Sequence, residues 1–158
     1  MTKVPYRFIL DVHLGKLARY LRLCGFDTAF FNDISDSGII DLSEKEDRII
    51  ITRDKELSAS KKVRQSLLVK SQDPEEQLRE IFRRYDLKDH TAPFTRCMKC
   101  NSPLAFADKE KIIDRLKPNT AKYYNRFMIC TECDHVYWEG SHFLKMKNFL
   151  DDIITHKV

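Results

Sequence analysis

Two pairs of cysteines constrain this sequence more than any other feature. Cys97 and Cys100 form one C-x-x-C pair, Cys130 and Cys133 form the second, and 29 residues separate the pairs. Two residues between cysteines allow both sulfurs of a tight turn to face one metal ion, and two such turns complete a tetrahedral site. The pattern therefore predicts a structural Zn²⁺ ion held by the four cysteines, with no open position for catalysis.

The residues around the cysteines support this prediction. A knuckle of this kind often needs a left-handed backbone directly after its second cysteine, and Asn101 and Asp134 are residue types that tolerate it. A redox dithiol or an iron–sulfur cluster is an alternative for the same thiols, and His135 or His142 could replace one of them as a ligand. The fifth cysteine, Cys24, makes the count odd, which argues against a disulfide framework, and its apolar spacing predicts a buried structural thiol.

The first part of the sequence alternates between strand-like and helix-like patterns. Four short apolar runs are typical of buried strands, at residues 6–10, 27–31, 48–52 and 66–70. Helical spacing predicts helices over 13–24 and 37–46, and a third that begins at Pro74 with Asp73 as its cap and Glu76 in the capping-box position. Strands that alternate with helices predict an α/β fold with a parallel sheet and right-handed crossovers.

The later part of the sequence has a different character. Residues 86–95 are polar and aperiodic, which indicates a linker, and the cysteine module follows over 96–142. A final amphipathic helix is expected over 143–154. A chain of 158 residues suits one small domain followed by a metal-stapled module, which we place at 1–90 and 91–158.

Composition excludes several classes of protein. The longest apolar run is too short to cross a bilayer and the first residues lack the apolar region of a signal peptide, so we expect a cytoplasmic protein without membrane partners. The 28 basic and 24 acidic residues give a formal net charge of only +4. This surplus does not indicate nucleic-acid binding, so a function of that kind has to rest on local clusters.

Four aspartates follow the predicted strands, at the edge where parallel sheets build their functional sites. Asp11 ends the first strand, Asp33 and Asp36 follow the second, and Asp54 follows the third. Each alone could be a loop or capping residue, because aspartate is common there. Repelling carboxylates that meet at one point need a cation, and oxygen ligands of this kind favour Mg²⁺ or Mn²⁺. Such a site can activate water for the hydrolysis of a phosphate ester.

Basic residues near these aspartates could hold the phosphates of a substrate. They are Lys16, Arg19 and Arg22 on one side of the first predicted helix, and Arg53 and Lys55 beside the last aspartate. The alternative is a solvated face with surface ion pairs. The cysteine module also interleaves aromatic and basic residues, which is typical of a nucleic-acid surface but equally of a small core with solvated lysines. These residues are Arg96, Lys99, Lys122, Tyr123, Tyr124, Arg126, Phe127, Tyr137 and Trp138.

In their order, these motifs resemble a known family. The segments FILD, LGKLARYLRLCG, DISD and RIIITRDKEL are similar to the PIN-like ribonuclease domain of the Mut-seven C-terminal type. The later segments DPEEQL, PFTRCxxCN and CxxCxxVYWxGSHFxxM are similar to the zinc ribbon of that family, and the resemblance extends over roughly residues 6–148. It implies a PIN-like three-layer α/β/α fold with a mostly parallel sheet, followed by a zinc ribbon, and metal-dependent cleavage of RNA.

The resemblance also implies roles for individual residues. Asp11, Asp36 and Asp54 match the acids that would hold Mg²⁺ or Mn²⁺. Thr52 is similar to the hydroxyl residue that often precedes the last of these acids.

Two positions depart from the family pattern. Larger relatives supply a further acid from an intervening helix, for which this chain has no clear match, and Asp33 or Asp73 could compensate. His13 stands where the family tends to have a small or apolar residue, and no role for it is evident.

These observations lead to three hypotheses about function. The first is a metal-dependent endoribonuclease in which a metal-bound water attacks a phosphodiester, Asp33 assists, and the basic residues and the ribbon grip RNA. The second is a catalytically weak RNA- or ribosome-associated binding protein that uses the zinc ribbon. The third, on the same metal site, is a DNA-end or nucleotide hydrolase. The expected partners are RNA and a ribosome or RNA-processing complex.

Overall fold

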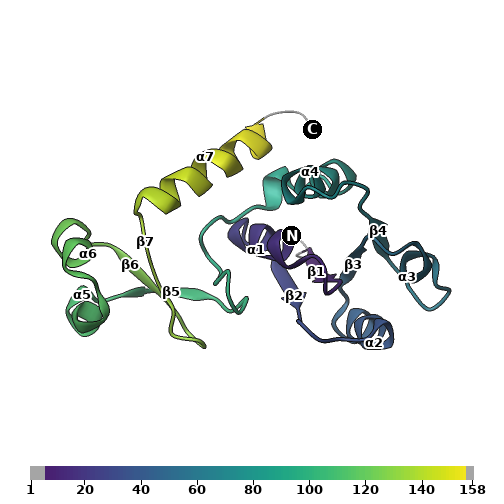
Figure 1. The fold of residues 1–158 in the computed structure, drawn as a ribbon, viewed down its shortest axis with the longest axis horizontal. Coiled ribbons are helices and arrows are strands. Elements are labelled where there is room, and N and C mark those ends of the chain that lie inside the picture. Colours follow the sequence, from purple (N-terminus) through teal and green to yellow (C-terminus); the bar gives the residue numbers. More distant parts are fainter. Residues whose placement is uncertain (1–5, 156–158) are drawn as a thin grey trace.

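The computed structural model describes residues 6–155; the outermost residues of the two predicted domains, 1–5 and 156–158, lie outside the described part of the chain. The first half forms a four-stranded sheet in the order β2-β1-β3-β4, in which all neighbouring strands are parallel (Figure 1). The predicted parallel sheet is therefore confirmed. Its strands are β1 (Arg7–Leu10), β2 (Asp27–Phe30), β3 (Ile49–Thr52) and β4 (Ser66–Leu68).

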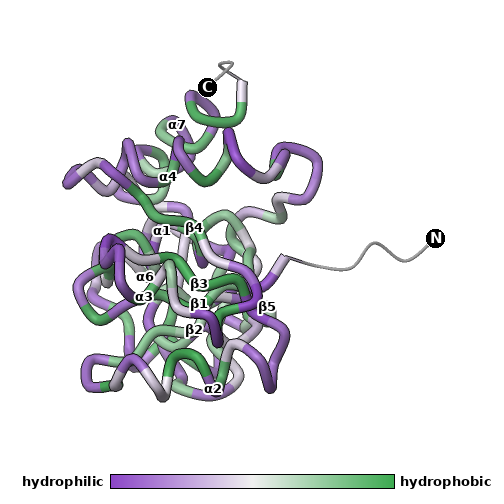
Figure 2. The backbone as a smooth tube through the Cα atoms, turned by 90° about the vertical axis from the view of Figure 1, so that its right-hand side faces the viewer, coloured by the Kyte–Doolittle hydropathy of each residue, from purple (hydrophilic) through white to green (hydrophobic). Residues whose placement is uncertain are grey.

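Helices cover both faces of this sheet, because successive side chains of a strand point to opposite sides. Phe8 and Leu10 of β1 join the core beneath α1 and α4, whereas Ile9 joins a second core beneath α2 and α3. β3 is buried along its whole length, as its run of isoleucines predicts. The expected three-layer α/β/α arrangement is confirmed, and Figure 2 shows the apolar strands at its centre. The helices are α1 (Gly15–Leu23), α2 (Asp36–Glu46), α3 (Lys55–Ala59) and α4 (Pro74–Arg84).

Polar residues at the ends of loops begin three of these helices. Ser35 caps α2, Asp54 caps α3 and Asp73 caps α4, each by accepting a hydrogen bond from a backbone N–H in the first turn. Asp73 and Pro74 therefore start α4 as predicted. The capping-box expectation for Glu76 is wrong, because its carboxylate pairs with two arginines of the same helix.

The second half contains a three-stranded antiparallel sheet in the order β5-β6-β7. The sequence predicts this cysteine module as a whole but none of its short elements. Two short helices separate the first two strands. One cysteine pair lies before the sheet, and the other begins at the last residue of β6 and ends in the turn before β7. The elements are β5 (Leu104–Ala107), α5 (Lys109–Ile112), α6 (Pro118–Tyr123), β6 (Phe127–Cys130) and β7 (Val136–Trp138), with 3-10 turns at Lys88–His90 and Ile113–Arg115.

The last helix, α7 (Ser141–Thr155), leads from the ribbon back over the first half of the chain (Figure 1). Leu150 and Ile153 are buried in the same core as α1 and α4. Phe149 packs on Tyr20 of α1, with ring centroids 4.9 Å apart. The predicted amphipathic helix is therefore confirmed. Within residues 6–155, no helix is long and apolar enough to span a membrane.

Candidate active site and four-cysteine centre

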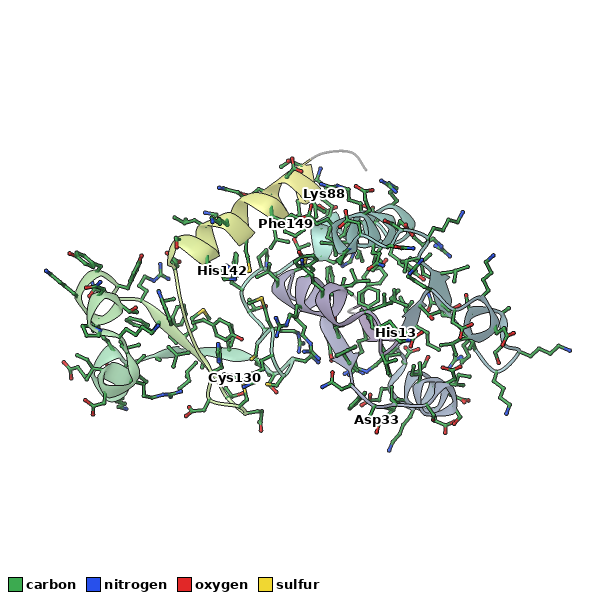
Figure 3. The ribbon with its side chains drawn as sticks, in the orientation of Figure 1. His13, Asp33, Lys88, Cys130, His142 and Phe149 are labelled. Carbon is green, nitrogen blue, oxygen red and sulfur yellow. The ribbon has the colours of Figure 1, made fainter. Side chains whose placement is uncertain are left out.

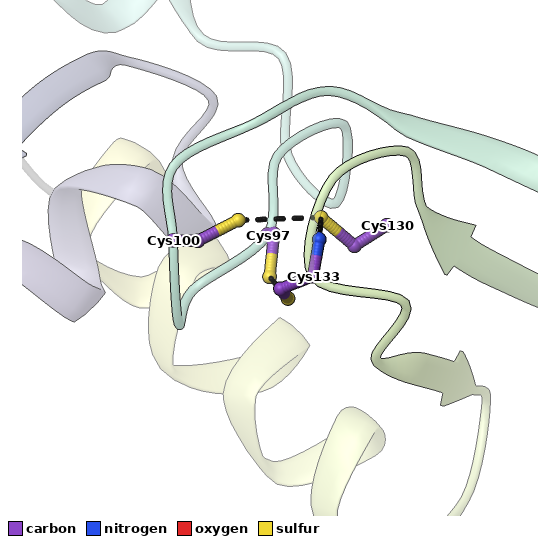
Figure 4. Close-up of side chains that lie close together, drawn as sticks. All are labelled: Cys97, Cys100, Cys130 and Cys133. Carbon is purple, nitrogen blue, oxygen red and sulfur yellow. Dashed lines mark hydrogen bonds between the residues drawn. The ribbon is translucent and has the colours of Figure 1, made fainter.

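The four cysteines converge on one point, as their spacing predicts (Figure 4). Their sulfurs all lie within 4.8 Å of one another. The Cys97 and Cys133 sulfurs are 3.6 Å apart, and those of Cys100 and Cys130 are 3.3 Å apart. Sulfurs arranged tetrahedrally around a zinc ion would be about 3.8 Å apart, since Zn–S bonds are about 2.3 Å long. The cluster therefore fits a metal ion with four thiolate ligands.

Each cysteine pair is followed by the left-handed residue that the sequence predicts. Asn101 has a φ of +77° and Asp134 a φ of +65°. Among the described residues the cluster contains cysteines alone, so neither His135 nor His142 replaces one of them. Cys24 lies fully buried in the α/β core, where burial raises the pKa of its thiol, in agreement with a structural role.

The first cysteine pair rests on the edge strand β2 of the parallel sheet. The Asn101 side chain donates a hydrogen bond to Asp27 Oδ1 at 2.7 Å and accepts one from the Thr28 N–H at 2.9 Å. Burial alone would raise the pKa of Asp27, but hydrogen bonds from Asn101 and Arg48 outweigh it and lower that pKa below its usual value. Asn101 thus covers polar groups of an edge strand and joins the ribbon to the sheet.

Arg22 belongs to this junction. It is only 6% exposed, and its guanidinium donates to the carbonyls of Thr28 and of the two residues between the first pair of cysteines. The expectation that Arg22 lies on an exposed basic face is therefore wrong, because its donors are used inside the protein. Lys16 and Arg19 do lie exposed on α1.

A depression of about 410 Å³ opens at the carboxyl edge of the parallel sheet. Three of the four predicted aspartates line it, namely Asp11, Asp36 and Asp54. Arg53 and His13 lie in the same lining, and His13 is labelled in Figure 3. Asp33, also labelled in Figure 3, is exposed and is not part of the lining. The sheet edge thus gathers most of the predicted acids.

Thr52 connects two of these aspartates. Its hydroxyl donates a hydrogen bond to Asp11 Oδ2 at 2.9 Å and accepts one from the Asp54 N–H at 2.9 Å. The other oxygen of Asp11 accepts from the Val12 N–H at 2.6 Å, and Asp54 Oδ1 accepts from two N–H groups in the first turn of α3. The fully buried Thr52 thus orients the carboxylate of Asp11, and the first turn of α3 orients that of Asp54.

Comparison with known families identifies the family to which this chain belongs. Residues 6–150 match the Mut7-C RNAse domain, which is almost the whole chain. The chain belongs to the Mut7-C RNase domain family. This family is one of ribonucleases, so membership implies RNA as the substrate and confirms the resemblance that the motifs indicate. No curated protein and no solved structure matches the sequence significantly.

The aspartates of this Mut7-C RNase domain share the depression without forming a tight cluster. Among the described residues, only the cysteines bring three or more metal-binding side chains to within 4.8 Å of one another. Asp36 is exposed, and its side chain makes no hydrogen bond or ion pair with any described residue. The depression therefore presents two fixed carboxylates, Asp11 and Asp54, and one that is free to move toward a ligand.

Other residues of interest lie at the rim or elsewhere. Lys55 is exposed in the first turn of α3, directly after the lining residues Arg53 and Asp54. Asp73, considered as a substitute acid, caps α4 outside the lining.

The place of His13 could have been inferred from its position three residues after the end of β1. No local pattern indicates that the side chain of Asn101 joins the two modules.

Proposed function

We propose that this Mut7-C RNase domain is a metal-dependent endoribonuclease whose reaction takes place in the depression at the carboxyl edge of the sheet. The observation that carries the proposal is the bridge through Thr52, which ties the carboxylate of Asp11 to the backbone of Asp54 just beyond the ends of the adjacent strands β1 and β3. The carboxylate of Asp54 is held in turn by the first turn of α3. Together with Asp36, they supply the oxygen ligands that Mg²⁺ and Mn²⁺ prefer.

The donor set fits a hydrated divalent cation. Mg²⁺ usually keeps several waters and is bound by one or two protein carboxylates together with substrate phosphates. Asp11, Asp36 and Asp54 would hold Mg²⁺ or Mn²⁺ in this way, without all three having to meet at one point. When bound, the ion supplies a water of lowered pKa and neutralises charge on the phosphoryl oxygens.

Neighbouring side chains would position the RNA. Arg53 lies in the lining, where its guanidinium can bind the phosphate that is cleaved. Lys16 and Arg19 on α1 and Lys55 on α3 are exposed and can bind phosphates on either side of it. His13 lies in the same lining, where its imidazole can donate a proton to the leaving oxygen.

We also propose that the four cysteines bind a structural Zn²⁺ ion. Four thiolates leave no position for water, so the ion would stabilise the ribbon and take no part in hydrolysis. The ribbon module at 91–158 would then support the nuclease module at 1–90 through Asn101 and Arg22, which touch both.

One observation favours a second function. The aspartates do not form a metal-binding group among the described residues, which is what we expect of a catalytically weak protein that binds RNA or a ribosome through the ribbon. In that case the protein would bind RNA, alone or within an RNA-processing complex, and would not cleave it.

Cleavage of labelled RNA with Mn²⁺, with Mg²⁺ or with neither decides between the two. The zinc-loaded protein is compared with Asp11→Asn and with Asp54→Asn, in which asparagine still caps α3. Asp41→Asn changes an exposed acid of α2 outside the lining and is the matched control.

We expect cleavage to require the added metal and to fall at least about a hundredfold in both aspartate variants, with the control unaffected. Cleavage that survives in both variants would contradict the proposal, and RNA binding without any cleavage would support the second function. Parallel reactions on DNA test the hydrolase hypothesis.

A further inference from the structure

A second hollow, of about 830 Å³, lies between the ribbon sheet and the start of α7. We call it the aromatic groove, and the proposed catalytic reaction makes no use of it. Its lining residues come from β5–β7 and the start of α7, which Figure 1 labels, and they include His142, labelled in Figure 3. The side chains that define its walls are Phe94, Phe106, Met128, Tyr137, Trp138 and Phe143.

One wall of the aromatic groove is a face of the ribbon sheet. Phe106, Met128 and Tyr137 are direct partners on β5, β6 and β7, so their side chains form a row across the sheet. Phe106 is 74% exposed, which is uncommon for a large apolar side chain, and the Arg126 guanidinium lies 5.8 Å from its ring centroid. Trp138, the next residue of β7, belongs to the other face of the sheet, where its ring packs on Phe127, but it is also part of the groove lining. This wall presents flat aromatic faces beside a cation.

The opposite wall is built on Phe94 and Phe143, whose ring centroids are 4.2 Å apart. Phe94 has a φ of +62°, which is a steric outlier for a bulky residue. A hydrogen bond from its N–H to the Leu23 carbonyl at 3.1 Å holds it there. Backbone strain of this kind persists only where the surrounding structure enforces it, so the position of this ring is strongly determined.

Helix α1 connects the aromatic groove with the catalytic depression. Leu14, at the N-cap of α1, lines the depression, and Leu23, at its last turn, lines the groove. The 9 residues of α1 span about 13 Å. Lys16 and Arg19 are exposed along the helix, on the side that ends at the buried Leu23, where Phe94 of the groove is hydrogen-bonded to the helix. Two cations thus lie along the helix that links the depression to the groove.

We propose that the aromatic groove binds unpaired bases of a single-stranded RNA whose backbone follows α1 into the depression. The path of the strand rests on the proposed function, whereas base binding itself requires no cleavage. Aromatic faces and a stacked guanidinium bind bases of any sequence. The bases of a duplex are stacked inside the helix and cannot enter. A protein partner would have no need of the cations between the groove and the depression, which is why we favour RNA.

Trp138 is the only tryptophan of the chain, so its fluorescence reports on the groove directly. Zinc-loaded Asp11→Asn protein, which should not cleave, is titrated with a short single-stranded RNA, with the same RNA as a duplex, and with an abasic strand that keeps the phosphates. We expect the base-containing single strand alone to quench the fluorescence. Equal quenching by all three, or none by the single strand, would overturn the proposal.

The second measurement is the affinity of two variants for the single strand. Phe106→Ala removes an exposed stacking face of the groove. Tyr123→Ala is its matched control, because Tyr123 is 66% exposed and has Lys122 5.3 Å from its ring centroid, yet lies outside the lining. We expect Phe106→Ala to weaken binding about tenfold and the control to change it less than about twofold, with both unfolding temperatures unchanged.

Equal affinity of Phe106→Ala and the parent would overturn the proposal and leave the apolar lining to a protein partner. Failure of the catalytic proposal would be seen separately, because the unsubstituted protein would then bind RNA in the groove without cleaving it.

Discussion

Asn101→Gly tests whether the ribbon and the parallel sheet stabilise each other through their junction. The Asn101 side chain donates to Asp27 Oδ1 at 2.7 Å and accepts from the Thr28 N–H at 2.9 Å. Glycine adopts a φ of +77° without strain, so the substitution removes both hydrogen bonds while the knuckle backbone can keep its shape.

The expected loss of stability follows from these contacts. Thr28 is fully buried, and a buried N–H without a partner costs about 1–3 kcal/mol. A hydrogen bond to a charged group contributes about 1.5–3 kcal/mol, part of which Asp27 retains through Arg48. Release of the left-handed strain returns about 1 kcal/mol. We therefore expect the free energy of unfolding to fall by about 2–3 kcal/mol, which lowers the melting temperature by roughly 5–10 °C.

Thermal and urea unfolding of the zinc-loaded protein, followed by circular dichroism, measure this change. Asp134→Gly is the matched control, because Asp134 has a similar φ of +65° in the second knuckle but is exposed and pairs with Arg115 at the surface. The control should lose less than about 1 kcal/mol. If Asn101→Gly were no less stable than Asp134→Gly, the role of this junction would be refuted.

Three further predictions concern single side chains. Thr52→Val keeps the volume but removes the hydroxyl that joins two aspartates, so the rate of RNA cleavage should fall about tenfold or more; a rate close to that of the unsubstituted protein would contradict its positioning role. Arg22→Met should lower the free energy of unfolding by about 2–3 kcal/mol, whereas Arg19→Met should weaken RNA binding and leave stability unchanged; the reverse result would return Arg22 to the RNA interface. Since the pKa of Asp27 is lower in the folded than in the unfolded protein, its stabilising contribution is present above about pH 4 and is lost as the pH falls through the folded pKa; unfolding measured between about pH 6 and 3 should therefore depend less on pH in Asp27→Asn.

The elements of the first half are predictable because each carries its own local pattern. The isoleucines of β3 are buried on both faces, and Asp73 with Pro74 begins α4. The rule that parallel strands build sites at their carboxyl ends also predicts that Asp11 and Asp54 line one depression, because Asp11 follows β1 directly and Asp54 lies two residues after β3.

The remaining features depend on contacts between distant segments. Spacing alone groups Arg22 with Lys16 and Arg19. Its guanidinium, however, donates hydrogen bonds inside the protein to backbone carbonyls of the first cysteine knuckle, more than 70 residues away in the sequence. Asp33 lies in the loop before α2, whose conformation decides that Asp36 and not Asp33 lines the depression. The short strands of the ribbon show no strong periodicity, because a small module that closes around four cysteines needs little apolar core of its own.

The binding of Mn²⁺ tests most directly whether the depression at the carboxyl edge is a catalytic metal site. Electron paramagnetic resonance measures free Mn²⁺ during titration of the zinc-loaded protein in the presence of RNA. We predict a single Mn²⁺ site for which Mg²⁺ competes, which Asp11→Asn abolishes and Asp41→Asn leaves intact. Absence of Mn²⁺ binding, or binding that is unchanged in Asp11→Asn, would contradict the proposed catalytic site.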